Sequence, residues 1–152
     1  MLDLTLSEAQ RRTLAPWAAD CAARALARFE AAAPGDGRPR AAIDGLRAFA
    51  RAELPVEAVR TLSAAAHAAA REVREPAAVA AARAAGHAAA IAHTGSHARG
   101  VIYAAKASAD PQAELDWQLA HASPQVKAIL DALPMPREGT TLIACFARKL
   151  RP

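Results

Sequence analysis

Three histidines stand close together in a segment that otherwise carries mainly small side chains. The run GHAAAIAHTGSHARG, residues 86–100, contains His87, His93 and His97. Imidazole is the side chain that titrates near neutral pH, and it is a common metal ligand. These three residues are therefore the first candidates for a binding site, a metal site or a pH-sensitive site.

His93 and His97 are the candidate metal ligands, because a spacing of four places two side chains on one face of a helix. Zinc sites use that spacing. The glycine between the two histidines is expected to end the helix, and a zinc site also needs a third ligand and supporting carboxylates. No Asp or Glu occurs between Glu75 and Asp110. A metal site is therefore kept only as an alternative, and no cofactor is predicted.

A structural role is the other interpretation of His87. Arg83 lies four residues earlier, and a nearby cation lowers the pKa of an imidazole and keeps it neutral. A neutral imidazole donates one hydrogen bond and accepts another, so it can tie a helix to a neighbour. His67 lies among arginines and is expected to be solvated, whereas His121 is expected to stack on Trp117. Structural, partner-binding and metal interpretations of the histidines remain open.

The other reactive groups do not form a catalytic constellation, and no enzyme activity is predicted. Cys21 lies on the apolar stripe of a predicted helix and is expected to be buried and inert. Cys21 and Cys145 have no CxxC spacing, which argues against a zinc ribbon or a disulfide framework. Ser96 is adjacent to His97, but Ser96 is better interpreted as a helix cap.

The elements that position these residues are predicted to be helices. The chain has 152 residues, of which 46 are alanine, and its aromatic content is 4%. Alanine favours helices and permits close packing, whereas strands prefer β-branched and aromatic residues. The sequence therefore predicts one all-α domain over residues 1–152. We expect a compact multi-helix bundle or a short α-solenoid of about six to seven helices.

Capping residues and prolines mark the helix boundaries. Ser7 and Gln10 form a predicted capping box, and Pro16 is expected either to kink the first helix or to delay its start. The predicted helices span residues 8–32, 39–53, 55–74, 76–93 and 96–109, followed by short helices from 111 and 124. A turn is predicted at 134–139, and the tail beyond it is either a short helix or an extended arm.

The predicted helix 76–93 has no proper polar face and is expected to be central. Gly86 in this helix would let a neighbouring backbone approach closely. The sequence AAGHAAA at 84–90 also repeats AAAHAAA at 64–70. This similarity fits either a helix-pair repeat or chance similarity between alanine-rich helices.

The charged residues argue against nucleic acid as a partner. The net charge is +4, but the basic residues are scattered among acids. Asp20 with Arg24, and Asp44 with Arg47, have the spacing of pairs within a helix. No signal peptide and no long uncharged apolar span is visible, so a cytoplasmic protein without a membrane partner is expected. The sequence does not indicate an oligomeric state.

A family resemblance rests on two long segments and several shorter ones. The long segments are LAPWAADCAARALARFEAAAPGDGRPRAAIDGLRAFARAE, residues 14–53, and AARAAGHAAAIAHTGSHA, residues 81–98. The most specific elements are WAADC at 17–21, DGRPR at 36–40 and the histidine run. Through these, about residues 10–125 resemble a bacterial immunity-protein family of polymorphic toxin systems.

The resemblance implies an all-helical cytoplasmic protein without enzyme activity that binds and neutralises a cognate toxin. Because this chain is basic, the toxin surface is expected to be acidic or mainly apolar. The alternative function is a small-ligand or metal-binding helical module that uses the histidines. The predicted binding residues are His87, His93, His97, Asp36, Arg38, Arg40 and Tyr103.

The loop residues among them have a second interpretation. Arg38 and Arg40 could offer guanidinium groups to a partner's carboxylates. Alternatively, they could pair with Asp20 or Glu30 and only fix the loop. The sequence does not decide between these two interpretations.

Overall fold

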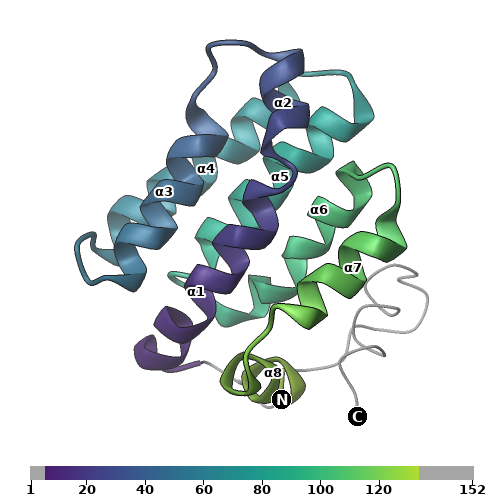
Figure 1. The fold of residues 1–152 in the computed structure, drawn as a ribbon. Helices are drawn as coiled ribbons and strands as arrows, with labels where there is room; N and C mark the ends of the chain where they lie inside the picture. Colours follow the sequence, from purple (N-terminus) through teal and green to yellow (C-terminus); the bar gives the residue numbers. More distant parts are fainter. Residues whose placement is uncertain (1–5, 134–152) are drawn as a thin grey trace.

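Residues 6–133 form eight α-helices and one 3-10 helix, shown in Figure 1. The computed structural model describes these residues, except for the side chains of Ser96, Arg99 and Val101. The predicted turn at 134–139 and the tail after it lie outside this range. The elements are α1 (Glu8–Ala23), α2 (Leu26–Ala32), α3 (Arg38–Ala50), α4 (Val56–Arg71), α5 (Pro76–Ala90), η1 (Gly95–Val101), α6 (Ile102–Ala107), α7 (Pro111–Ala120) and α8 (Pro124–Ala132).

Local capping signals mark the starts of α1, α5, α7 and α8. The Ser7 hydroxyl accepts a hydrogen bond from the Gln10 backbone N–H at 3.1 Å, and the Gln10 side chain accepts one from the Ser7 N–H at 2.9 Å. This confirms the capping box at the start of α1. Asp110 and Ser123 cap α7 and α8, each followed by a proline in the first turn. The N-terminal N–H groups of these helices thus receive acceptors from adjacent residues.

The predicted count of six to seven helices was too low by one α-helix. The helix predicted over 8–32 is two helices, because the chain turns at residues 24–25 rather than at Pro16. The turn coincides with long-range contacts of Arg24. Its guanidinium donates to both carboxylate oxygens of Glu114, at 2.9 and 2.7 Å, and lies 4.1 Å from the centroid of the Trp117 ring.

One of the two predicted ion pairs within a helix was wrong. Arg24 binds Glu114 of α7 instead of Asp20, and Asp20 accepts a hydrogen bond from Arg47 of α3 at 3.0 Å. The predicted pair of Asp44 with Arg47 is present at 3.7 Å. Arg24, at the C-cap of α1, and Asp20 of α1 thus pair with residues of α7 and α3 rather than with each other.

Helix α5 is central, as its lack of a polar face predicted. It packs against α1, α2, α3, α4, α6 and η1. Its ten buried residues are all alanine or glycine, which allows the neighbouring helices to approach closely. The buried Ser63 hydroxyl of α4 donates to the Gly86 carbonyl at 2.8 Å. In an α-solenoid each repeat contacts only its neighbours, so the described part of the chain is a bundle.

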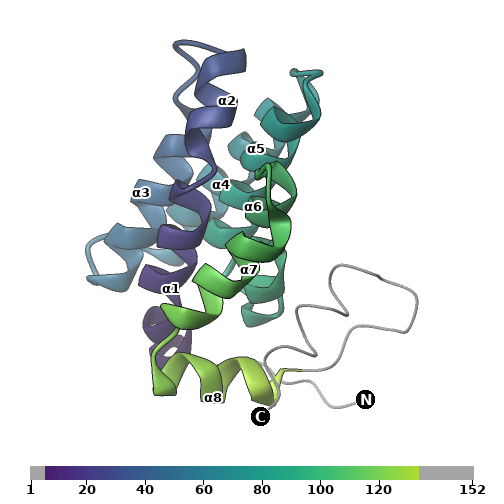
Figure 2. The same ribbon diagram turned by 45° about the vertical axis from the view of Figure 1, so that its right-hand side comes forward.

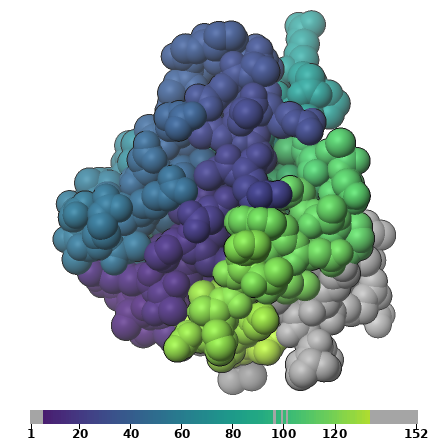
Figure 3. Space-filling model, viewed as in Figure 1, coloured from purple at the N-terminus to yellow at the C-terminus, as the bar shows by residue number. Residues whose placement is uncertain are grey.

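The other helices surround α5 in a definite arrangement. In Figure 1, α3 and α4 lie on one side of α5, α6 and α7 lie on the other, and α1 lies in front. Figure 2 shows α8 crossing the end of the bundle, where it contacts α1. In the space-filling view of Figure 3, α1–α3 and α7–α8 form most of the visible face and largely cover α5 from this side. Within the described range, none of the helices combines the length and apolarity needed to cross a membrane.

Candidate functional site

Four histidines from consecutive parts of the chain meet beside α5. His67 lies on α4, His87 on α5, His93 in the turn after α5, and His97 in η1. The His87 ring centroid lies 4.9 Å from that of His67 and 5.2 Å from that of His97. The His97 and His93 centroids are 6.1 Å apart. We call these four residues the histidine cluster, which joins the three histidines selected from the sequence with one that was not selected.

Two glycines provide the space for two of these rings. A Cβ atom on Gly86 would lie 2.6 Å from His67 Nε2, and one on Gly100 would lie 2.4 Å from His87 Cγ. The expectation of close approach at Gly86 is confirmed, although the neighbour is a ring rather than a backbone. The expectation that His67 is solvated was wrong, because the contact with Gly86 leaves this side chain half-buried.

The two similar sequences AAAHAAA and AAGHAAA account for this contact. They lie on α4 and α5, which pack against each other, and their two histidine rings meet edge to face at an interplanar angle of 80°. The glycine in the second sequence is the residue on which the first histidine rests. The similarity was therefore the signal in the sequence that could have identified His67.

The contact between His87 and His97 depends on their protonation. Their Nδ1 atoms are 3.0 Å apart. One Nδ1 must donate a hydrogen and the other must accept it, since a bare imidazole nitrogen is an acceptor and a protonated one is a donor. If both rings carried a positive charge, two N–H groups would face each other. The contact therefore requires at least one of the two rings to be neutral.

Burial keeps the cluster neutral near pH 7. The pKa of His87 is lowered to about 4, mainly by burial and to a smaller extent by the neighbouring His67, His97 and Arg83. Burial is also the main cause that lowers the pKa values of His67, His93 and His97. A buried imidazole loses hydration that its charged form needs more than its neutral form. These residues therefore act as uncharged rings under ordinary conditions.

Several cationic side chains surround the cluster. Arg11, Arg60, Arg71 and Arg83 each lower the pKa of at least one of its histidines. Arg60 and Arg71 belong to α4, Arg83 to α5, and Lys106 to α6. Within residues 6–133, no ion pair with a carboxylate is formed by Arg60, Arg71, Arg83 or Lys106. We call Arg60, Arg71, Arg83 and Lys106 the basic face.

An open groove adjoins the histidine cluster between α5 and α6. The Tyr103 ring stacks on His87 with centroids 5.0 Å apart and an interplanar angle of 6°, and Lys106 Nζ lies 4.6 Å from the Tyr103 centroid. The sequence selected Tyr103 but not the other lining residues, because the groove exists only where two helices pack together. The groove has a volume of about 280 Å³ and is lined by Pro76, Val79, Ala80, Arg83, Tyr103 and Lys106.

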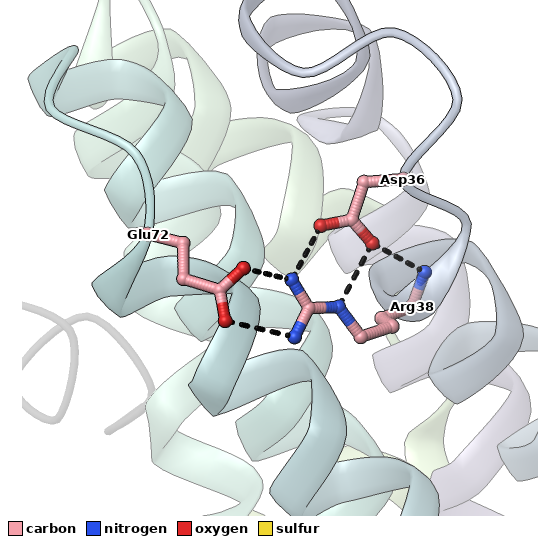
Figure 4. A network of polar contacts seen from close by, with 3 residues as sticks. All are labelled: Asp36, Arg38 and Glu72. Carbon is pink, nitrogen blue, oxygen red and sulfur yellow. Dashed lines mark hydrogen bonds and ion pairs between the residues drawn. The ribbon is translucent and has the colours of Figure 1, made fainter.

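The predicted loop residues lie elsewhere and make internal ion pairs. The Arg38 guanidinium binds Asp36 at 2.7 Å and Glu72 at 2.6 Å, as Figure 4 shows. Arg40 binds Glu30 of α2 at 2.5 Å, which is one of the two pairings considered from the sequence. Hydrogen bonds from Arg38 lower the pKa values of Asp36 and Glu72. These interactions join the α2–α3 loop to the end of α4, and contact of these residues with a toxin remains a prediction.

The metal alternative is not favoured by the geometry. α5 ends at Ala90 and η1 begins at Gly95, so His93 and His97 do not share a helical face. In the part of the chain that the structure describes, no group of three or more histidines, cysteines or carboxylates is arranged to hold a metal ion.

The remaining reactive residues have structural surroundings. Cys21 is fully buried, and this burial raises the pKa of its thiol far above the ordinary range. The thiol is therefore a poor nucleophile, since the thiolate is the reactive form. The predicted stacking of His121 on Trp117 is confirmed, with centroids 4.0 Å apart and an interplanar angle of 18°.

Comparison with known proteins identifies the family of the chain. No curated protein sequence and no solved structure matches it. The family model described as Imm-5 like putative immunity protein matches residues 4–125. This range includes the α2–α3 loop, the histidine cluster and the groove, and it confirms the resemblance found in the sequence. The chain therefore belongs to the Imm-5 like putative immunity protein family.

Proposed function

We propose that this protein is an immunity protein that binds a cognate toxin in the cytoplasm and neutralises it by protein–protein contact. The family match over residues 4–125 is the observation that carries this proposal. The basic face supports it, because cations without internal partners remain available to a binding partner. Complementary charges increase the rate and specificity of protein association.

The chemistry of the reactive groups favours binding over catalysis. Burial raises the pKa of the Cys21 thiol and lowers the pKa values of the clustered histidines. No carboxylate occurs in residues 76–109, so these histidines lack a neighbouring acid from that segment. A general base usually needs a pKa near the working pH and a partner that orients it. The cluster fits a role as a rigid support better than a role in proton transfer.

The basic face is the preferred contact surface, and the loop is the second choice. Arg38 and Arg40 already bind carboxylates of this chain. A toxin would have to displace those ion pairs before it could use the same guanidinium groups. Arg60, Arg71 and Arg83 would not require such an exchange, and the proposed contact includes Tyr103, with His87 as the ring that supports it.

Co-purification and protection assays test this function. The product of the neighbouring toxin gene, with its activity disabled, is co-expressed with the tagged full chain. We expect the two proteins to purify together, and we expect the full chain to restore growth to cells that express the active toxin. An unrelated helical protein at equal expression is the control. If the chain neither binds nor protects against any adjacent toxin, it does not have the proposed function.

A further inference from the structure

The groove between α5 and α6 combines an apolar wall with two cations. Val79 and Ala80 of α5 provide the apolar wall, and Arg83 and Lys106 line the polar part of the groove. Both cations are exposed. An aliphatic wall beside two cations suits a carboxylate side chain, whose methylene groups can contact the wall while its oxygens bind the cations.

No carboxylate of the described chain competes for these two cations. Arg83 and Lys106 have no ion pair within residues 6–133, whereas Arg24, Arg38 and Arg40 each bind a carboxylate. Glu75 immediately precedes α5, but its carboxylate accepts hydrogen bonds from the N–H groups of residues 77 and 78 at 3.2 and 2.7 Å. A negative partner can therefore come from another molecule without breaking an internal ion pair.

The back of the groove is closely packed. Tyr103 is stacked on His87, and His87 is fixed by Gly100 on one side and by the His97 ring at 5.2 Å. A surface that is already ordered loses little conformational entropy when a partner binds. The neutral rings also add no charge of their own, so Arg83 and Lys106 provide the attraction for an anion.

From this arrangement we infer that the groove is the docking site for an acidic side chain, flanked by an apolar residue, on the surface of the toxin. This inference rests on the proposed function, and it names the contact surface and the chemistry of the partner. Nucleic acid is less suited to the groove. Phosphates are usually bound by cations and polar groups, whereas Val79 and Ala80 are apolar. The Tyr103 ring also contacts both His87 and Lys106, so it is poorly placed to stack a base.

Charge reversal with a matched control tests the inference. The described residues contain two lysines, and both Lys106 on α6 and Lys127 on α8 are exposed. We expect Lys106→Glu and Arg83→Glu each to weaken binding of the inactive toxin by about tenfold or more, whereas Lys127→Glu changes it by less than about twofold. Circular dichroism and thermal unfolding verify that each variant is folded. A toxin variant in which the contacting carboxylate is replaced by lysine should restore affinity for Lys106→Glu.

A positional measurement complements the affinities. Carbodiimide joins an amine directly to a carboxylate that touches it, so treatment of the complex should link Lys106, and not Lys127, to a toxin Asp or Glu in mass spectra. If the wild-type protein binds toxin while Lys106→Glu and Arg83→Glu bind equally well, the groove assignment is wrong and the proposed function stands. If these variants lose binding to single-stranded DNA and keep their affinity for toxin, the groove binds nucleic acid and the inference is also wrong.

Absence of any toxin binding by the wild-type protein would overturn the proposed function instead. The groove can then be tested with acetyl-Leu-Glu-Leu amide as the probe. Amide resonances of residues 79–83 and 103–106 should shift on titration at low ionic strength, and these shifts should disappear in Lys106→Glu. Shifts that are absent, or that persist in Lys106→Glu, would show that the groove does not recognise a carboxylate.

Discussion

The α2–α3 loop and the α4–α5–α6 side of the molecule both carry guanidinium groups, yet their charges have opposite surroundings. At the end of this loop, Arg38, the first residue of α3, lies between the carboxylates of Asp36 and Glu72. On the basic face, Arg60, Arg71 and Arg83 surround neutral imidazole rings and have no ion pair within residues 6–133. The loop uses its charge to hold the fold together, whereas the basic face leaves its charge available.

The two regions also differ in how tightly they are packed. A Cβ atom on Gly37, the last residue of the loop, would meet no atom within 4 Å, whereas one on Gly100 would lie 2.4 Å from His87 Cγ. The histidine cluster is thus built by steric fit and burial, and the loop by exposed ion pairs. Steric fit responds strongly to small changes in volume, whereas exposed ion pairs contribute little.

The same substitution in both regions should therefore give unequal effects, with the largest loss at Gly100. Gly100→Ala places a methyl group against His87 Cβ and Cγ, atoms that α5 holds in place. We expect this overpacking to lower the free energy of unfolding by about 1–3 kcal/mol. Gly37→Ala should change it by less than about 0.5 kcal/mol. Urea unfolding monitored by tryptophan fluorescence measures both.

A double variant identifies the source of the loss at Gly100. Removing the ring with His87→Ala should make the added methyl group less harmful, so Gly100→Ala should cost less in that background than in the wild type. Equal losses for Gly37→Ala and Gly100→Ala would show that the packing of the two regions does not differ as described.

Acid should destabilise the two regions in separate pH ranges. The unfolded chain has histidine pKa values near 6.5, whereas His87 in the folded protein has a pKa of about 4. Between these values the unfolded state binds more protons than the folded state, so the free energy of unfolding falls as the pH falls. We expect about 1–2 kcal/mol from His87 after allowing for screening by solvent. Urea unfolding at a series of pH values measures this slope.

The loop carboxylates respond below that range. Arg38 lowers the pKa values of Asp36 and Glu72, so their contribution to stability is present above their unfolded pKa values and is lost as the pH falls below about 4. In His87→Gln the loss between pH 6.5 and 4 should become smaller, and the loss at lower pH should remain. An unchanged slope in His87→Gln would mean that this ring does not control acid stability.

Much of the fold followed from local features of the sequence. Capping residues and first-turn prolines located the starts of α1, α7 and α8, and the missing polar face identified α5 as central. The turn at residues 24–25 was not predictable in this way, because no glycine or proline lies there. That turn accompanies contacts of Arg24 with Glu114 and Trp117, which are distant in the sequence.

The candidate site was predicted only in part for the same reason. His87, His93 and His97 are close in the sequence, and the structure brings them together. His67 joins them because α4 packs on α5, and the similarity of AAAHAAA to AAGHAAA is the one sign of this pairing that the sequence offered. The groove likewise depends on the contact of α5 with α6. Short-range patterns reveal elements and their caps, whereas pairings between elements require three-dimensional information.

The smallest effect is expected from Arg38→Ala, which tests the loop side of the comparison. The substitution removes both ion pairs of Arg38, so the Asp36 and Glu72 carboxylates lose this guanidinium as a partner. The melting temperature should fall slightly at neutral pH, because solvent screens this exposed network. The difference from wild type should shrink in high salt and in acid, where the carboxylates are protonated. Arg28→Ala, at an exposed arginine outside the network, is the control for differential scanning calorimetry.

Arg38→Ala also separates the two candidate contact surfaces. If the basic face is the contact, the variant should protect cells from the toxin as well as the wild type does, since Arg38 only holds the loop against α4. Lys106→Glu should lose protection under the same conditions. The opposite result would place the binding site at the loop. In that case the folded Arg38→Ala variant would fail to protect cells, whereas Lys106→Glu would still protect them. Asp36, Arg38 and Arg40 would then serve the role that the sequence first suggested for them.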